Sequence, residues 1–182
     1  PGPQPNSRTW FPGANANAVK EMVLAALFLS SRKISDGIDW AKSLKGKGSE
    51  IPKLIEKGKS AFVGPEISGK KFGVIGLGAI GALVANDAHA LGMEVTGYDP
   101  FISVRAAWSL SRAIHRAESL DSLMEESDYI TIHIPLLPDT RNFVNEEFLS
   151  KCKKGVRLLN FARGELVQTD ALVKSLNDGT VS

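Results

Sequence analysis

Apolar runs typical of strands alternate with helical stretches from Lys71 to the end of this 182-residue chain, and this alternation restricts the fold most. A helix between two strands is a crossover connection, so the strands are expected to be parallel, with helices on both faces. The expected fold class is therefore α/β, with a doubly wound parallel sheet. We expect strands at 71–75, 93–98, 129–134 and 156–161, and helices at 79–91, 105–114, 120–126, 146–152 and 169–177.

A glycine-rich turn separates the first expected strand from its helix. The segment 74–81 reads VIGLGAIG and contains the pattern G-x-G-x-x-G after a strand and at the start of a helix. Gly76 permits a tight turn, Gly78 lets the backbone approach a pyrophosphate, and Gly81 lets the helix lie close to the sheet. The helix N-terminus offers free N–H groups to a diphosphate. A plain strand–turn–helix corner without a ligand is the alternative.

Asp99 stands at the end of the second expected strand. A carboxylate there can accept hydrogen bonds from a ribose diol, and it would repel a 2′-phosphate. Phe101 and Ile102 follow, where an NADP site would more often place a cation. The predicted cofactor is therefore NAD. A simpler role for Asp99, as the first residue of a turn with Pro100, stays open.

The segment before the sheet has a different character. Residues 1–12 are rich in proline and show no apolar periodicity, so they are expected to form a leader or boundary segment outside the fold. A helix is expected to follow, with Asn15 or Asn17 as its cap and apolar residues at helical spacing from Val19 to Leu27. Weaker helical stretches are expected around Trp40 and Leu54.

Composition argues against several kinds of partner. The 22 basic and 20 acidic residues nearly balance and no basic arm stands out, so nucleic acid is not expected. The most apolar run, 22–29, is far shorter than the roughly 20 residues of a membrane span. The single cysteine, Cys152, suits a reducing compartment. We expect a soluble cytoplasmic protein, with no membrane partner and no metal site.

Three longer motifs extend the pattern beyond the glycine turn. They are GANANAVKE at 13–21, HIPLLP at 133–138 with Thr140, and KKGVRLLNFARG at 153–164. Together with the glycine motif they resemble the D-2-hydroxyacid dehydrogenase family, and the resemblance covers residues 13–182. It implies a Rossmann NAD-binding domain and an NAD-dependent dehydrogenase. Within the family, the similarity is greatest to members that act on a phosphorylated 2-hydroxy acid.

In this family the arginine of the Asn-x-Ala-Arg-Gly motif contacts the substrate, which implies a catalytic role for Arg163. A planar guanidinium can hold a carboxylate at two points and polarise the reacting oxygen. A surface arginine paired with Glu165 is the alternative. The resemblance also implies cofactor contacts by Ala79 and Ile80 at the diphosphate, by Ile134 and Pro135 near the adenosine, and by Phe161 and Ala162, with Arg163, on the nicotinamide side.

None of the three histidines is expected to be the catalytic acid–base. In the family, a histidine oriented by a glutamate exchanges the proton, and both lie downstream of the arginine, which places them beyond Ser182. His89 falls within an expected helix, His115 in a variable connection, and His133 at a strand end, where it would shape the wall of the cofactor site. The sheet is therefore expected to be cut before its last strand, and the chain alone to be inactive.

The resemblance also divides the chain into parts. Residues 13–33 resemble the helix that links the two domains of the family, and 34–182 correspond to the NAD-binding domain, incomplete at its C-terminal end. Most of the substrate domain is expected to be missing. Trp40 and the lysine-rich stretch after it resemble a region that wraps around a second subunit, which implies a homodimer.

Other functions stay open at this point. The same chemistry could act on glycerate, glyoxylate or lactate, because residues that read a substrate phosphate would lie mainly in the substrate domain. A nucleotide-sensing binding protein on the same scaffold, or an isolated NAD-binding module, is a further possibility. The presence of Arg163 argues against a pure sensor, and a downstream histidine and glutamate would decide.

Overall fold

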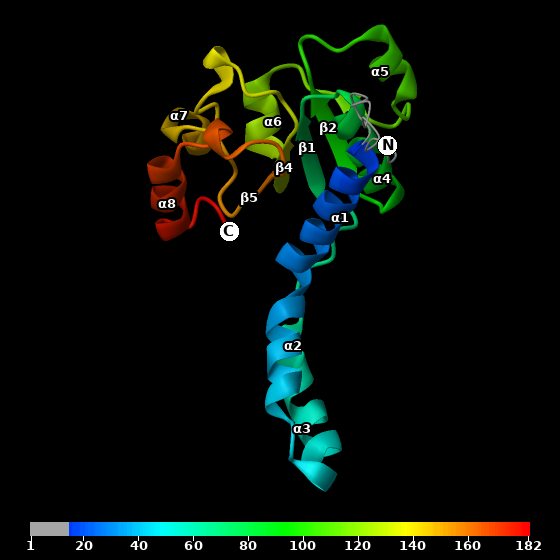
Figure 1. Cartoon of the computed structure of the whole chain (residues 1–182), viewed down its shortest axis with the longest axis vertical. Coiled ribbons are helices and arrows are strands. Elements are labelled where there is room, and N and C mark those ends of the chain that lie inside the picture. Colours follow the sequence, from blue (N-terminus) through cyan, green and yellow to red (C-terminus); the bar gives the residue numbers. More distant parts are fainter. Residues whose placement is uncertain (1–14) are drawn as a thin grey trace, which may run out of the picture.

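The computed structural model describes residues 15–182 and contains a five-stranded sheet with a helical arm projecting from it (Figure 1). The leader expected at 1–12 lies outside the described residues. All neighbouring strands are parallel, in the order β3-β2-β1-β4-β5, which confirms the doubly wound α/β class. Val181 forms a further parallel bridge to Val156 beside β5. The strands are β1 (Lys71–Ile75), β2 (Glu94–Tyr98), β3 (His115–Arg116), β4 (Tyr129–Ile132) and β5 (Arg157–Asn160).

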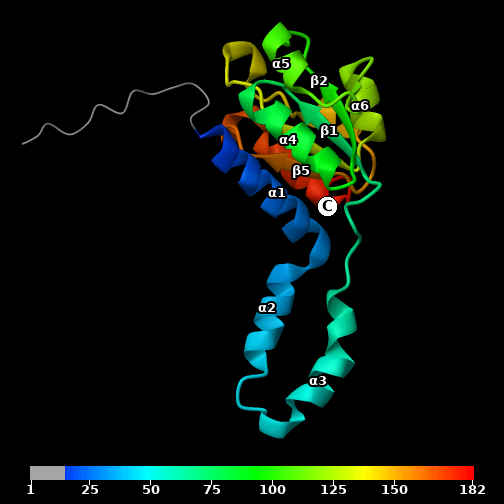
Figure 2. The same cartoon turned by 90° about the vertical axis from the view of Figure 1, so that its right-hand side faces the viewer.

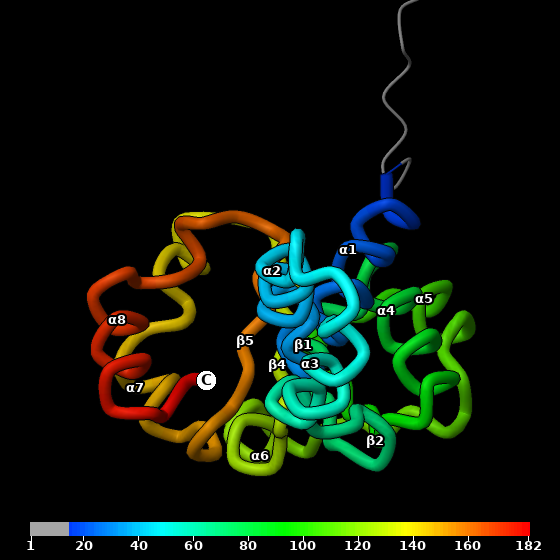
Figure 3. Tube along the Cα trace, turned by 90° about the horizontal axis from the view of Figure 1, so that it is seen from below, coloured from blue at the N-terminus to red at the C-terminus, as the bar shows by residue number. Residues whose placement is uncertain are grey.

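Helices cover both faces of this sheet, as the alternation predicts. Buried residues of α1 and α4 form one core layer, and those of α6, α7 and α8 form the other. In the view from below, α7 and α8 lie on the far side of β5 from α4 and α5 (Figure 3). Among the described residues, no helix is long and apolar enough to cross a membrane. The helices of this body are α1 (Ala16–Arg32), α4 (Ala79–Ala90), α5 (Val104–Ser109), α6 (Leu120–Glu126), α7 (Glu146–Ser150) and α8 (Thr169–Asn177).

Strand β1 shows how the sequence divides its side chains between the two layers. Phe72 and Val74 point into the layer of α1 and α4, whereas Ile75 belongs to the layer of α6. Gly73 also faces α6, and a Cβ atom there would lie 2.5 Å from a methyl carbon of Leu123. Glycine at this position therefore lets α6 approach the sheet closely.

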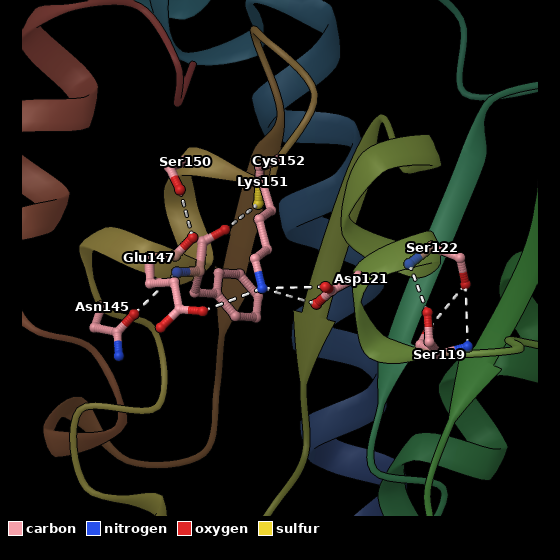
Figure 4. Close-up of polar contacts among 9 residues, drawn as sticks. Ser119, Asp121, Ser122, Asn145, Glu147, Ser150, Lys151 and Cys152 are labelled. Atoms are coloured by element: carbon pink, nitrogen blue, oxygen red, sulfur yellow. Dashed lines mark hydrogen bonds and ion pairs between the residues drawn. The ribbon is translucent and has the colours of Figure 1, made fainter.

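Helices α6 and α7 are defined by local polar contacts (Figure 4). Ser119 and Ser122 form a capping box at the start of α6, and the Asn145 side chain accepts a hydrogen bond from the Phe148 N–H at the start of α7. The Lys151 ammonium lies 3.1 Å from carboxylate oxygens of both Asp121 on α6 and Glu147 on α7, and so joins the two helices.

The arm consists of α2 (Ile34–Ser43) and α3 (Ile51–Gly58), with short 3-10 turns at Gly48–Glu50 and Lys59–Phe62. It extends away from the sheet as two roughly antiparallel legs (Figure 2). Within the arm, the rings of Trp40 and Phe62 pack together with their centroids 5.0 Å apart. The weak helical stretches expected around Trp40 and Leu54 are therefore confirmed as helices.

The base of the arm is fixed to the sheet by buried contacts. The Ser31 hydroxyl lies 2.7 Å from the Tyr129 hydroxyl of β4, and the Arg157 guanidinium lies 5.2 Å from the centre of the Tyr129 ring. The returning chain passes so close that a Cβ atom at Gly64 would overlap the Ser31 carbonyl. Lys33, with a φ of 47°, makes the bend between α1 and α2.

Three predicted ends were wrong by two residues or more. The strand expected at 129–134 ends at Ile132, the helix expected at 146–152 ends at Ser150, and the helix expected at 105–114 ends at Ser109. The helix stops because Asn86 of α4 binds its end: the Asn86 side chain donates to the Ser109 carbonyl and accepts from the Ser111 N–H. A side chain more than 20 residues away in the sequence therefore overrides the local helical pattern.

Candidate functional site

The glycine turn between β1 and α4 has the geometry that its motif predicts. Gly76 has a φ of +88°, and a Cβ atom there would lie 2.8 Å from the His133 carbonyl oxygen. A Cβ atom at Gly81 would overlap the carbonyl oxygen of Gly76. These two glycines therefore let the turn, the end of β4 and the first turn of α4 pack together.

Gly78 has a different role in the same turn. Its backbone is extended, it precedes the first residue of α4, and a Cβ atom there would meet no atom within 4 Å. No side chain in the described part of the chain caps this helix. The first amides of α4, which include those of Ala79 and Ile80, thus face open space at a partially positive helix end. This open, capless turn fits a diphosphate group.

Asp99 lies next to this turn at the carboxyl end of β2. Its Oδ2 accepts a hydrogen bond from the Leu77 N–H at 2.8 Å, and its Oδ1 accepts one from the Phe101 N–H at 2.9 Å. The second bond is the turn contact considered as the simpler role of Asp99, but the first joins it directly to the glycine motif. Because each carboxylate oxygen has two lone pairs, the side chain can still accept hydrogen bonds from a diol.

A pocket of about 570 Å³ opens beside the turn at the carboxyl edge of the sheet. Six residues predicted to contact the cofactor or the substrate line it together, although they come from three separate segments. Residues without a predicted contact also line it, from the first turn of α1 and from the end of β4. The predicted contact residues are Ile80, Ile134, Pro135, Phe161, Ala162 and Arg163; His133 was expected only in the wall, and the others are Asn15, Val19 and Leu136.

Arg163 is exposed at the mouth of this pocket. Its Nη1 donates to the Ala162 carbonyl at 2.9 Å, and within residues 15–182 no ion pair joins it to Glu165. The Asn160 side chain holds the loop, because it accepts from the Ala162 N–H at 3.0 Å and donates to the Arg163 carbonyl at 2.8 Å. The alternative of a surface arginine paired with Glu165 is therefore not seen.

His133 forms part of the pocket wall just after β4. Burial lowers its pKa from 6.5 to about 4, so the imidazole is neutral at physiological pH. Its Nε2 lies 3.0 Å from the buried hydroxyl of Thr131. Among the described residues that line the pocket, Arg163 is the only charged side chain. The pocket therefore favours an anionic ligand next to apolar and neutral walls.

Asn15 is the residue that sequence reasoning misplaced. It precedes α1 as expected of a cap, but its side chain makes no capping hydrogen bond and instead lines the pocket. The family-like motif at 13–21 was the available signal, because a helix start alone does not require so specific a sequence. The expected helix-capping role of Asn15 gave no indication that the residue lines the pocket.

The chain matches the family model for the NAD-binding domain of D-isomer specific 2-hydroxyacid dehydrogenases over residues 24–182. It is 36% identical over 170 residues to D-3-phosphoglycerate dehydrogenase of Synechocystis sp., covering 93% of this chain and 28% of the relative. The enzyme of the same name from Rattus norvegicus is 35% identical over 168 residues, with coverage of 92% and 29%. The chain thus spans less than a third of these relatives.

Solved structures show the same arrangement. D-lactate dehydrogenase of Aquifex aeolicus, complexed with NAD and lactic acid, has a TM-score of 0.77 and 30% identity, covering 94% of this chain and 47% of that one. The pyruvate reductase of Chlamydomonas reinhardtii has a TM-score of 0.76 and 34% identity, with coverage of 95% and 46%. Sheet order, glycine turn, pocket and family match agree: the chain belongs to the D-isomer-specific 2-hydroxyacid dehydrogenase family and contains its NAD-binding domain.

Proposed function

We propose that this protein oxidises 3-phospho-D-glycerate to 3-phosphohydroxypyruvate with NAD⁺, the first step of serine biosynthesis. The hydride leaves C2 for NAD⁺ and the hydroxyl proton is released, so the products include NADH and H⁺. The proposal is supported by relatives of this activity at 34–41% identity. The structural observation that carries it is the pocket in which Arg163, the one charged lining residue among those that the structure describes, lies beside the glycine turn.

The residues present fit NAD, which supplies the hydride acceptor when bound. The open turn from Gly76 to Gly81 and the first amides of α4 would hold the diphosphate. Asp99 would accept hydrogen bonds from the adenosine ribose, and its charge would exclude a 2′-phosphate. Ile134 and Pro135 would contact the adenosine, and Phe161 and Ala162 the nicotinamide side.

Arg163 would bind the substrate carboxylate and stabilise charge at the C2 oxygen as the alcohol becomes a ketone. Where a bound substrate and the apolar walls exclude water, this interaction would be stronger, because fewer water dipoles would screen the guanidinium. His133 is a poor candidate for the base, since a pKa of about 4 lies far below the pH of the cell. By the resemblance, the proton would instead pass to a histidine that is oriented by a glutamate, both downstream of Arg163.

We also propose that the arm of α2 and α3 packs against a second subunit in a homodimer. Neither helix has a buried residue, yet both carry large apolar side chains. Ile38 is 50% exposed and Ile55 is 40% exposed. Apolar residues on an extended arm of this kind are stabilised when a partner covers them.

A second candidate is reduction of an unphosphorylated 2-oxo acid. Solved structures similar to this chain include D-lactate dehydrogenases and a D-mandelate dehydrogenase. The pocket of this domain supplies the carboxylate grip that all such substrates share. A substrate panel with 3-phospho-D-glycerate, D-glycerate, D-lactate and D-mandelate would separate the two candidates.

The test of the proposal is Arg163→Lys in the intact protein that carries this chain. Lysine keeps the charge but cannot form the planar two-point contact, so kcat/KM should fall at least roughly 10- to 100-fold. The dissociation constant of NAD should change far less, because the diphosphate site is separate. Arg105→Lys, on exposed α5, is the matched control and should behave as wild type. A wild-type kcat/KM in Arg163→Lys would contradict the proposed role.

A further inference from the structure

We propose that Asp99 is also a positioning residue for the phosphate-binding turn, so that NAD preference and diphosphate binding depend on one carboxylate. This inference rests on the proposed function, in which Asp99 reads the ribose diol. The reading of the ribose needs only a free carboxylate at the end of β2. The observed contacts go further, because they tie that carboxylate to the backbone of the turn itself.

The turn is attached to β2 at three points. The Gly76 N–H donates to the Tyr98 carbonyl at 2.9 Å, and the Leu77 N–H donates to Asp99 Oδ2 at 2.8 Å. The buried Leu77 side chain packs against Gly97, where a Cβ atom would lie 2.8 Å from it. Of these three contacts, only the hydrogen bond to Asp99 depends on a polar side chain.

The position of Leu77 makes this bond important. Leu77 lies between Gly76, whose φ is +88°, and Gly78, around which a Cβ atom would touch nothing within 4 Å. Glycines on both sides give this stretch of backbone more freedom in the unbound state than other residues would. A charged acceptor on the amide between them restricts that freedom, and so keeps the neighbouring amides directed toward the diphosphate.

Asp99 is itself held in the orientation that this task requires. The Phe101 N–H binds Oδ1 at 2.9 Å, which leaves Oδ2 directed at the Leu77 amide. Both oxygens keep a lone pair for the ribose hydroxyls, so cofactor binding does not need to break the contact with the turn. The carboxylate therefore serves the turn and the ribose at the same time.

A consequence follows for cofactor choice. Removal of the carboxylate relieves the repulsion of a 2′-phosphate, but it also releases the Leu77 amide. A small residue at position 99 should then weaken the diphosphate site for both cofactors, and the gain in NADP binding should be less than the lost repulsion alone would give. The loss of the Leu77 contact therefore limits how far a substitution of Asp99 can shift the preference from NAD toward NADP.

The decisive comparison uses Asp99→Ala and Asp99→Asn in the full chain, titrated with an NAD analogue whose adenosine carries a 2′,3′-dideoxyribose. Both variants lack the carboxylate charge and the analogue lacks the diol, so their difference reports the backbone hydrogen bond that an oxygen at position 99 still accepts. Asparagine keeps one oxygen, and hydrogen exchange at the Leu77 and Phe101 amides shows which of the two it binds. We expect Asp99→Ala to bind the analogue roughly 5- to 10-fold more weakly than Asp99→Asn. Equal affinities, with the Leu77 amide protected in Asp99→Asn, would overturn the inference.

Amide hydrogen exchange gives an independent readout without any ligand. The Leu77 amide should exchange at least roughly 10-fold faster in Asp99→Ala than in wild type, while the Gly76 amide keeps its bond to Tyr98 and its rate. Asp178→Ala is the matched control, because it removes a similar bond from the Thr180 N–H at the far end of α8. Unchanged exchange at Leu77 would also overturn the inference.

The proposed reading of the ribose is tested separately with wild type and Asp99→Ala. Wild type should bind NAD more tightly than the dideoxy analogue, and this gap should vanish in Asp99→Ala. A gap that persists would contradict the ribose contact and leave the positioning role intact. If the gap is lost but Asp99→Ala and Asp99→Asn bind the analogue equally, the ribose contact stands and the positioning role is contradicted.

Discussion

In the sheet, β4 buries all four of its residues and β1 buries four of its five, whereas in the arm neither α2 nor α3 has a single buried residue. The sheet satisfies its own side chains, because helices from the same chain cover both faces. The arm's own contacts are local: Trp40 packs against Phe62, the Lys33 ammonium donates to the Ala61 carbonyl, and Ser31 anchors the base. The comparison teaches that the shape of the nucleotide-binding body is set within the chain, while the arm relies on what surrounds it.

The largest effect is expected from Gly81→Ala, which adds a methyl group where the first turn of α4 approaches the glycine turn. The new methyl group would overlap the Gly76 carbonyl, so α4 or the turn must move. Overpacking against backbone should destabilise the protein by about 3 kcal/mol, and the displaced amides should weaken NAD binding more than roughly 100-fold. Denaturant unfolding and calorimetric NAD titration measure the two effects.

Gly164→Ala is the control for this experiment. Gly164 has no positive φ and a Cβ atom there would meet nothing within 4 Å, so the unfolding free energy should stay within about 0.5 kcal/mol of wild type. If Gly81→Ala were equally harmless, the close approach of α4 to the turn would not be a requirement of the fold.

The second prediction concerns the arm. Ile38→Asp together with Ile55→Asp places charges on its apolar surface, where the side chains are 50% and 40% exposed and the folded monomer loses little buried area. The body should keep its stability and NAD affinity, but the dissociation constant of the homodimer should rise at least roughly 100-fold, because a buried unpaired charge costs several kcal/mol. Analytical ultracentrifugation over a concentration series measures this change.

Val173→Asp provides the matched control on the body. Val173 lies on α8 and is 50% exposed, the same exposure as Ile38, but it is far from the arm. Its substitution should leave the assembly unchanged. A dimer that survives the double arm substitution would show that the two subunits meet through another surface.

The same contrast explains what could be predicted from the sequence. Periodicity and the glycine motif located β1 and α6 to the residue, because local pattern and core packing agree there. The end of α5 could not be predicted, since Asn86 determines it through contacts distant in sequence. The arm was predicted only as weak helices, and its projection from the sheet has no local signal.

The site was predictable to a similar degree. Motifs located the glycine turn and the three segments that line the pocket, but they did not indicate that Asn15 joins them. The bond between Asp99 and the Leu77 amide was also missed, because the spacing of a motif carries no information on which backbone group a side chain meets. Asn15 and Asp99 thus each have a role other than the predicted one, and the sequence did not indicate it.

The third prediction is a pH dependence that belongs to the body. The pKa of His133 is lowered to about 4 in the folded protein, so below its ordinary value of 6.5 the unfolded chain binds the proton more readily. The stabilisation is complete above about pH 6.5 and is lost as the pH falls toward 4. At about 1.4 kcal/mol per pKa unit, the loss approaches 3 kcal/mol.

A glutamine at position 133 cannot titrate, so the unfolding free energy of His133→Gln should depend less on pH between 6.5 and 4. Urea denaturation at a series of pH values measures it. His115→Gln, on exposed β3, is the control and should follow the wild-type curve. Parallel curves for wild type and His133→Gln would show that the imidazole is not held neutral by burial.

The smallest effect is expected at the joint between the two regions. Tyr129→Phe removes the hydroxyl that lies 2.7 Å from the Ser31 hydroxyl, but it keeps the ring beneath the Arg157 guanidinium. The Ser31 hydroxyl, which remains, keeps its own bond to the Leu27 carbonyl at 2.6 Å and so is not left wholly unpaired. The unfolding free energy should fall by only about 1 kcal/mol.

Tyr98→Phe removes the other tyrosine hydroxyl of the chain and serves as the control. Hydrogen exchange should then show faster opening at the end of α1 in Tyr129→Phe alone, whereas unchanged exchange there would mean that the arm is held to the sheet by its backbone at Gly64 rather than by this pair.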